Sequence, residues 1–322
     1  MSQPEPASGH DDRPAGQGPE SDEPAAAPRS GASLNEGGRS GRFALHKPDG
    51  QPVRTGRNLP LAITSGVLLG ALVLAAIYPW PAAFIAITSI ATLVGLRELR
   101  RALAGRGTAI AAVPVAVGGV AMQVCAYFGG PEWVVGAFAL TVIVALSWRL
   151  RGGAAGYVRD ASASLFAASY VPLLLSTWLL LLAEDDGQRR LIAFIVVTIS
   201  SDIGGYFAGI LLGRHKMAPV ISPNKTWEGF GGSVLGCMIA GGLTVSLMLD
   251  GPVWAGVVLG LAVVAAATVG DLIESLVKRD LGLKDMGRFM PGHGGLLDRV
   301  DSLLIGGPVS WMVLTLLVPP AL

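Results

Sequence analysis

Long apolar runs of about 20 residues constrain the fold of this chain more than any other feature. An α-helix rises about 1.5 Å per residue, so a run of this length matches the hydrocarbon core of a bilayer. Hydrophobic residues make up 51% of the 322 residues and charged residues only 15%, against roughly 25% in soluble domains. We therefore predict an all-α fold for a polytopic integral membrane protein, and the composition argues against a single soluble globular domain.

We expect about nine transmembrane helices by the 20-residue criterion. Glycines four residues apart, such as Gly205 with Gly209 and Gly232 with Gly236, are predicted to let neighbouring helix backbones approach closely. The expected spans are 59–78, 81–98, 109–128, 133–148, 161–183, 190–212, 228–249, 252–277 and 301–319.

Residues 1–58 differ sharply in composition from the rest of the chain. They contain no Ile, Trp or Tyr, and 17 of the 58 residues are Gly or Pro. Such a segment has too little apolar surface to offset the entropy of ordering, so it is predicted to be a disordered cytoplasmic tail. No apolar stretch follows Met1 within the first 30 residues, which argues against a cleaved signal peptide. The predicted division is thus a tail over 1–58 and a transmembrane domain over 59–322.

Basic residues are distributed unequally between the two sets of loops. With the N-terminus inside, the inside loops after residue 58 hold 15 Lys and Arg, whereas the outside loops hold two, Arg189 and Arg190. This asymmetry predicts a cytoplasmic N-terminus by the positive-inside rule. The net charge of +1 excludes a globally basic nucleic-acid binder, and the two cysteines, both in apolar runs, exclude a disulfide-rich scaffold.

Several acidic residues fall inside or beside the apolar runs. Asp202 interrupts the sixth span, Asp271 and Glu274 lie near the end of the eighth, and Glu228 opens the seventh. A lone charge at the bilayer centre costs about 2.5–3.5 kcal/mol on insertion scales. Glu228 is explained by a helix N-terminus, but Asp202 follows about a dozen mostly apolar residues, and we expect it to have a functional role.

The first polar loop, 213–228, carries cations, hydroxyls and an amide just before a helix start. Ser222, Asn224, Lys225 and Thr226 could bind phosphate there, because a helix N-terminus presents unpaired backbone N–H groups. The alternative is a capped loop, with Thr226 as the N-cap and the basic residues as topology markers. Taken alone, the loop does not decide between the two.

The second polar loop, 278–300, lies between two helices that also carry charge. Asp271, Glu274, Ser275 and Lys278 fall at i, i+3, i+4 and i+7 and so share one helix face. Asp298 and Asp301 repeat the i, i+3 spacing at the next helix start. Carboxylates beside cations are typical of a site for Mg²⁺ and a nucleoside triphosphate, whereas a solvated charged loop would not need this spacing on both flanking helices.

The residues of these loops resemble those of a known family. The pattern Ser275-x-x-Lys278-Arg279-x-x-x-x-Lys284-Asp285, followed by Pro291-x-His293-Gly294-Gly295-x-x-Asp298-Arg299-x-Asp301, closely resembles the C-terminal motif of phosphatidate cytidylyltransferases, also called CDP-diglyceride synthases. The stretch 222–229 and Asp202 with Gly205 and Tyr206 are similar to further polar patterns of that family. Between Asp285 and Pro291 the chain departs modestly, since Arg288 adds a cation.

The resemblance implies the reaction CTP + phosphatidate → CDP-diacylglycerol + pyrophosphate at the cytoplasmic face of the plasma (inner) membrane. It implies Mg²⁺ as cofactor, with room for a second cation such as K⁺, and a homodimer. Asp271 and Asp298 are expected to bind the metal, with Asp301 a further candidate. The expected catalytic residues are Asp202, Lys225, Asp271, Lys278, Arg279, Asp298 and Arg299. The expected substrate-binding residues are Ser222, Asn224, Thr226, Glu228, Ser275, Lys284, His293 and Gly294.

Two other classes of protein fit part of the same pattern. An ion-coupled membrane transporter would also have glycine-rich helices and intramembrane acids, but no inverted repeat is visible in this sequence. A CTP-dependent lipid-alcohol kinase would have a similar charge pattern. The destination of the CTP phosphates distinguishes these classes.

Overall fold

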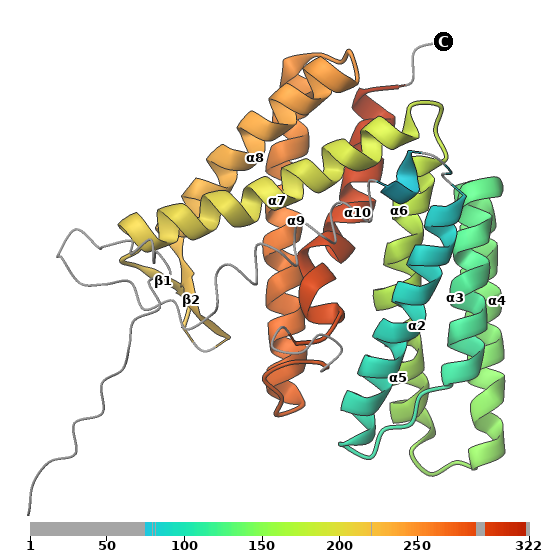
Figure 1. The fold of residues 1–322 in the computed structure, drawn as a ribbon. Helices are drawn as coiled ribbons and strands as arrows, with labels where there is room; N and C mark the ends of the chain where they lie inside the picture. The colour runs from blue at the N-terminus through green and yellow to red at the C-terminus, as the bar shows by residue number, and fades with distance from the viewer. Residues whose placement is uncertain (1–74, 79, 81, 220, 288–293, 320–322) are drawn as a thin grey trace, which may run out of the picture. The chain divides into compact units, whose positions relative to one another are not determined.

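The computed structural model describes residues 75–78, 80, 82–219, 221–287 and 294–319. The fold is all-α over these residues, apart from one short hairpin (Figure 1). The predicted tail, 1–58, lies outside the described residues, and the first expected span, 59–78, is described only at 75–78.

The helices are α2 (Ala83–Ala104), α3 (Ala112–Phe128), α4 (Pro131–Arg149), α5 (Tyr157–Ala168), α6 (Leu174–Leu182), α7 (Gly187–Leu212), α8 (Trp227–Met248), α9 (Val253–Asp280) and α10 (Leu297–Leu317). A 3₁₀ turn, Leu150–Gly152, follows α4, and a π-helical turn, Ser169–Leu173, joins α5 to α6. The strands β1 (Lys216–Ala218) and β2 (Ser222–Thr226) form an antiparallel pair.

Six helical segments of the described residues are long and apolar enough to cross a membrane. They are Pro131–Gly152, Tyr157–Leu182, Gly187–Leu212, Trp227–Met248, Val253–Asp280 and Leu297–Leu317. The apolar helix α3 is shorter, and α2 is less apolar because its second half carries Arg97, Glu98 and Arg100. The prediction of an all-α polytopic membrane protein is confirmed, whereas the count of nine spans stays a prediction.

The helices form two groups that meet where α10 and α7 contact α6. The helices α2 to α6 pack beside one another, and α10 contacts α6 from this group. On its other side α10 packs on α9, which packs on α8, and α8 packs along α7 (Figure 1). The helices α9 and α10 therefore lie in the middle of the helix arrangement, within reach of side chains from both groups.

Glycines allow α7, α8 and α9 to approach closely, as the sequence predicted. A Cβ atom at Gly236 of α8 would lie 2.7 Å from the carbonyl oxygen of Ser200 on α7, closer than real Cβ contacts occur. On the next interface, a Cβ at Gly241 of α8 would collide with the carbonyl oxygen of Gly256 on α9. Small residues at these positions are the usual packing device between helices in lipid.

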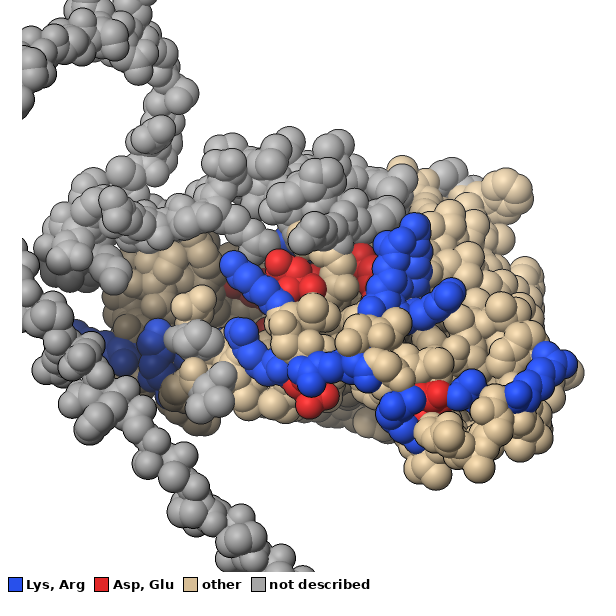
Figure 2. Space-filling view, turned by 90° about the horizontal axis from the view of Figure 1, so that it is seen from below, with Lys and Arg blue, Asp and Glu red and all other residues tan. Residues whose placement is uncertain are grey.

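The basic loops gather at one end of the helices. Arg106, after α2, donates from Nη2 to the carbonyl oxygen of Asp280 at the end of α9 (2.7 Å). At the opposite end, Arg190 donates from Nη2 to the carbonyl oxygen of Val318 after α10 (2.5 Å). Figure 2 looks onto the end with the basic loops, where Lys and Arg side chains surround a smaller group of acidic ones.

Replacing Gly241 by alanine should destabilise the protein by about 1–3 kcal/mol, because the new methyl group overpacks the α8–α9 contact. The matched control is Gly231→Ala on the same helix, where a Cβ would have no neighbour within 4 Å. This control should keep or slightly raise stability through its better helix propensity. Thermal unfolding in detergent measures both, and equal midpoints for the two variants would contradict the proposed packing.

Candidate active site

The β1–β2 hairpin is fastened to the start of α8 by two side chains. Thr226 caps α8, since its Oγ1 accepts a hydrogen bond from the backbone N–H of Gly229 (3.1 Å). The carboxylate of Glu228 is 2.6 Å from Nδ1 of His215 and accepts from the backbone N–H of Arg214 (3.1 Å). The capping role considered for Thr226 and the helix-start role considered for Glu228 are therefore confirmed, and both side chains have partners within the protein.

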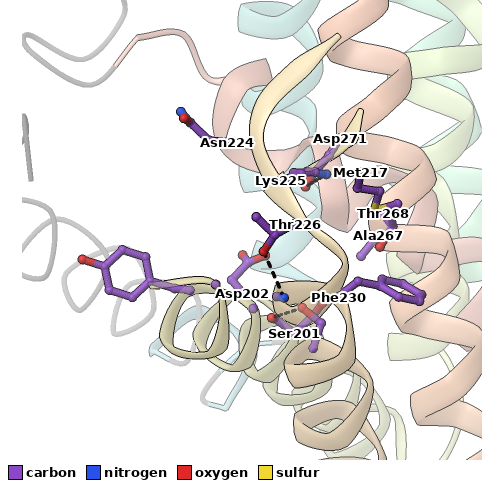
Figure 3. A pocket seen from close by; sticks show the side chains of 15 residues that line it. Ser201, Asp202, Met217, Asn224, Lys225, Thr226, Phe230, Ala267, Thr268 and Asp271 are labelled. Atoms are coloured by element: carbon purple, nitrogen blue, oxygen red, sulfur yellow. Dashed lines mark hydrogen bonds and ion pairs between the residues drawn. The ribbon is translucent and has the colours of Figure 1, made fainter. Parts of the chain in front are cut away.

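A pocket of about 180 Å³ opens between α7, α8, α9 and the hairpin (Figure 3). Asp202 lines it from α7, Lys225 from β2 and Asp271 from α9. Asp202 is exposed to this pocket, which gives an acid on a membrane-spanning helix a polar environment. Three residues that lie far apart in the sequence, and that were each predicted to be catalytic, thus share one cavity.

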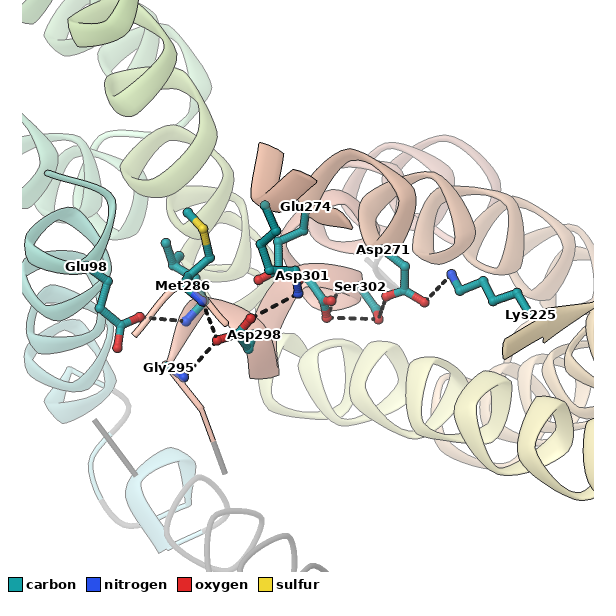
Figure 4. A network of polar contacts seen from close by, with 11 residues as sticks. Glu98, Lys225, Asp271, Glu274, Met286, Gly295, Asp298, Asp301 and Ser302 are labelled. Carbon is teal, nitrogen blue, oxygen red and sulfur yellow. Dashed lines mark hydrogen bonds and ion pairs between the residues drawn. The ribbon is translucent and has the colours of Figure 1, made fainter. Parts of the chain in front are cut away.

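A chain of polar contacts leads from this pocket to α10 (Figure 4). The ammonium group of Lys225 is 2.5 Å from Oδ2 of Asp271. The other carboxylate oxygen of Asp271 accepts a hydrogen bond from the hydroxyl of Ser302 (2.6 Å), which also lies 3.3 Å from Oδ1 of Asp301. The network therefore links β2, α9 and α10 through an ammonium group, a carboxylate, a hydroxyl group and a second carboxylate.

A second set of contacts is centred on Lys278 of α9. Its ammonium group lies 2.7 Å from Oε2 of Glu274 and 3.0 Å from Oδ1 of Asp298. The Oδ2 atom of Asp298 accepts from the backbone N–H groups of Met286 (2.9 Å) and Gly295 (2.8 Å). Asp298 therefore joins the ion pair to both sides of the loop between α9 and α10.

The remaining predicted residues lie around these two sets of contacts. Gly294 has a left-handed backbone (φ 83°) beside Asp298, where a Cβ would lie 3.1 Å from Oδ2 of Asp298. His293 lies outside the described residues. Ser222 and Ser275 are half-buried on β2 and α9, Arg299 is half-buried in the first turn of α10, and Asn224, Arg279 and Lys284 are exposed.

The predicted metal ligands have separate partners in the structure. Asp271 pairs with Lys225 and Asp298 pairs with Lys278. Within the part of the chain that the structure describes, no three His, Cys, Asp or Glu side chains group closely enough to hold a metal ion by themselves. One oxygen of Glu274, Oε1, is buried and has no hydrogen-bond partner among the described residues. The expected metal site therefore stays a prediction.

Glu98 of α2 is a site residue that the sequence analysis missed. Its carboxylate accepts hydrogen bonds from the backbone N–H groups of Leu296 (3.0 Å) and Leu297 (3.1 Å), and only 5% of the residue is exposed. A single acid among the arginines of 97–101 is the signal that could have drawn attention to it. Its partners are almost 200 residues away in the chain, so no local pattern could identify them.

The fold and this site define a polytopic membrane protein with a network of carboxylates and lysines at the junction of its two helix groups. The chain belongs to the cytidylyltransferase family, whose model matches residues 61–317.

Bacterial relatives resemble this chain, two of them over most of its length and a third over about half of it. A protein of Mycobacterium leprae named phosphatidate cytidylyltransferase is 39% identical over 309 residues, covering 90% of this chain and 98% of that relative. A protein of the same name from Mycobacterium tuberculosis (strain ATCC 25618 / H37Rv) is 39% identical over 292 residues, covering 86% of this chain and 88% of that relative. The protein so named in Brucella suis is 43% identical over 153 residues, 47% of this chain and 55% of its own.

Asp202→Asn tests whether the acid of α7 acts in the reaction or only fills a polar cavity. The substitution keeps the shape and removes the charge, so a cavity-filling role would leave both stability and turnover intact. We expect kcat to fall at least about tenfold with unchanged thermal stability, because the charge faces the pocket that holds Lys225 and Asp271. A stable and fully active variant would refute a catalytic role for Asp202.

Proposed function

We propose that this protein transfers CMP from CTP to phosphatidate, giving CDP-diacylglycerol and pyrophosphate in phospholipid biosynthesis. Membership of the cytidylyltransferase family and the names of its relatives support the reaction class and the substrates. The observation that carries the proposal is the pair of neighbouring polar networks. One runs from Lys225 through Asp271 and Ser302 to Asp301, and the other joins Lys278 to Glu274 and Asp298. Together they bring cations and carboxylates of β2, α9 and α10 to the segments that carry the family motifs.

The chemistry is an in-line displacement at the α-phosphorus of CTP. A phosphate oxygen of phosphatidate forms the new P–O bond, and the bond from the α-phosphorus to the β-phosphate oxygen breaks as pyrophosphate leaves with its electron pair. Catalysis of this kind depends mainly on positioning and on neutralising charge. Phosphatidate is already an anion near neutral pH, so no dedicated general base is required, and the substrate role predicted for His293 is phosphate contact.

Lys225 and Lys278 are the side chains that we assign to the substrate phosphates. Each is half-buried and held by carboxylates, Lys225 by Asp271 and Lys278 by Glu274 and Asp298. Half-buried ammonium groups interact more strongly with phosphate than surface ones do, because less water screens them. Arg279, Lys284 and Arg299 surround them and would contribute further positive charge, while Ser222, Asn224 and Ser275 would donate hydrogen bonds.

Mg²⁺ is the cofactor that the donor set fits. Asp271, Asp298 and Asp301 would offer the hard oxygen ligands that Mg²⁺ prefers. One or two of them would suffice for an ion, because Mg²⁺ completes its shell with water and phosphate oxygens, and no three acids of the described residues group closely enough to hold it alone. The buried, unpartnered oxygen of Glu274 next to this cluster is a further sign of missing positive charge. A bound Mg²⁺ would neutralise charge on the triphosphate, and a second cation such as K⁺ would have ligands in the same acidic group.

The orientation and assembly of the protein are part of the same proposal. The basic residues that gather at one end of the helices support an active site on the cytoplasmic face of the inner membrane, where CTP is available. The family resemblance supports a homodimer.

Labelled CTP tests the reaction and distinguishes the alternatives. Purified protein in detergent is mixed with phosphatidate and CTP that carries ³²P in either the α or the γ position. We expect the α-label to enter a CDP-lipid and the γ-label to leave as pyrophosphate. Transfer of the γ-label to a lipid alcohol would instead show a kinase, and an intact CTP pool with no labelled lipid would favour a transporter.

Removing a predicted metal ligand should abolish turnover without unfolding the protein. Asp271→Asn and Asp298→Asn should each lower kcat more than about tenfold at saturating Mg²⁺, because few anionic ligands hold the ion. The control is Asp185→Asn, since Asp185 is exposed beside the start of α7, at the opposite end of the helices. Stabilisation by Mg²⁺ in thermal unfolding is measured alongside, and a variant that keeps both turnover and this Mg²⁺ effect would refute the assignment of that ligand.

A further inference from the structure

We infer that Glu98 and Arg106 of the α2 region are positioning residues for the active site. In this inference they hold the start of α10 and the end of α9, and so fix the distance between Lys278 and Asp298. The inference rests on the proposed function for its kinetic part. Both residues act through backbone groups of other elements, so neither needs to touch a substrate.

Glu98 meets α10 at the end where a negative charge is most stabilising. The N–H groups of Leu296 and Leu297 belong to the start of α10, where backbone donors have no partner within the helix. Glu98 accepts from both, at 3.0 and 3.1 Å, and its charge also complements the positive end of the helix dipole. Because Glu98 is almost fully buried, water does not offer these two donors an equivalent partner.

The loop ends are shaped around this carboxylate. A Cβ at Gly295 would lie 2.6 Å from Oε2 of Glu98, and a Cβ at Gly287 would collide with Oε1. The same two loop ends also hold Asp298, which accepts from the N–H groups of Met286 and Gly295. Glu98 on one side and Asp298 on the other therefore fix the same short backbone segments (Figure 4).

Arg106 performs the complementary task at the end of α9. Its Nη2 donates to the carbonyl oxygen of Asp280 (2.7 Å), and its Nε lies 3.5 Å from the carbonyl oxygen of Leu281. A cation at a helix C-terminus satisfies free carbonyls and complements the negative end of the dipole. The α2 region thus places an acid at the start of α10 and a base at the end of α9.

The consequence for the site follows from Lys278. This residue lies on α9, two residues before Asp280, and it contacts Asp298 in the first turn of α10. A shift of either helix end changes the 3.0 Å contact between them and moves the ammonium group relative to the phosphates. Misplacement of a charge-neutralising group by about 1 Å can cost about a hundredfold in rate, so a distant tie to α2 can control kcat.

The experiment uses the full chain in detergent and two independent measurements. The variants are Glu98→Gln, Glu98→Ala, Arg106→Ala and the conservative Arg106→Lys. The control is Arg97→Ala, an exposed residue on the same helix. Amide hydrogen exchange reports the backbone groups at 286 and 295–297 directly, and kcat and KM for CTP are determined per folded molecule.

We expect Glu98→Gln to lower kcat at least about tenfold with a smaller change in KM, because the two N–H groups donate to different oxygens of Glu98 and glutamine replaces one of these acceptors with an NH₂ donor. Exchange at Leu296 and Leu297 should rise in the same variant. Arg106→Ala should lower kcat several-fold, and Arg106→Lys should recover part of it by keeping the charge. Arg97→Ala should match wild type in both measurements.

The two measurements also separate the possible failures. Unchanged exchange at 286 and 295–297 in Glu98→Ala would overturn the inference, whatever the activity. Increased exchange with an unchanged kcat would overturn it as well, because the tie would then be structural only. If the wild-type protein makes no CDP-lipid, the proposed function fails, while the exchange data still test the contacts of Glu98 and Arg106.

Discussion

The rest of the site depends on the two ion pairs that the ammonium group of Lys278 forms, one with Glu274 and one with Asp298. Glu274 is 1% exposed on a helix that spans the membrane, and a charge in that environment is tolerated only with a partner. Asp298 belongs to the next helix, so the pair that makes Glu274 tolerable also fixes α9 against α10. Lys278 therefore both neutralises the buried charge of Glu274 and holds α9 and α10 in the arrangement that forms the site.

The close approach of α7, α8 and α9 then determines what that site contains. Their glycine contacts bring backbones together more tightly than larger side chains would permit. As a result Asp202, on the far helix of the group, opens into the same pocket as Lys225 and Asp271. The β1–β2 hairpin adds the cation of this pocket, because β2 positions Lys225 next to the carboxylate of Asp271 on α9.

Periodicity and hydropathy predicted the parts of this structure that are local in sequence. The apolar runs predicted the membrane helices from α4 onward. Spacing also predicted that Glu274 and Lys278 share one helix face, and in the structure the two side chains are in contact there. The hairpin was not predicted, since two strands of three and five residues with polar side chains show no alternation. Glu98 was missed because its hydrogen bonds join residues 198 and 199 positions apart, and only the tertiary fold brings them together.

The depth of the network distinguishes a two-substrate enzyme from a transport pathway. Asp298 lies at the start of α10, whereas Asp271 lies nine residues from the end of α9, a distance of about 14 Å along a helix. Beyond Asp271 the rest of α9, residues 253–270, contains no charged residue, and neither does α10 from Ser302 onward. On these two helices, charged groups therefore run from the loops to about a third of the length of α9 and end there. A path that starts in water and stops at this depth suits a nucleotide that meets a lipid phosphate, while an ion pathway would need polar groups on both sides of its binding site.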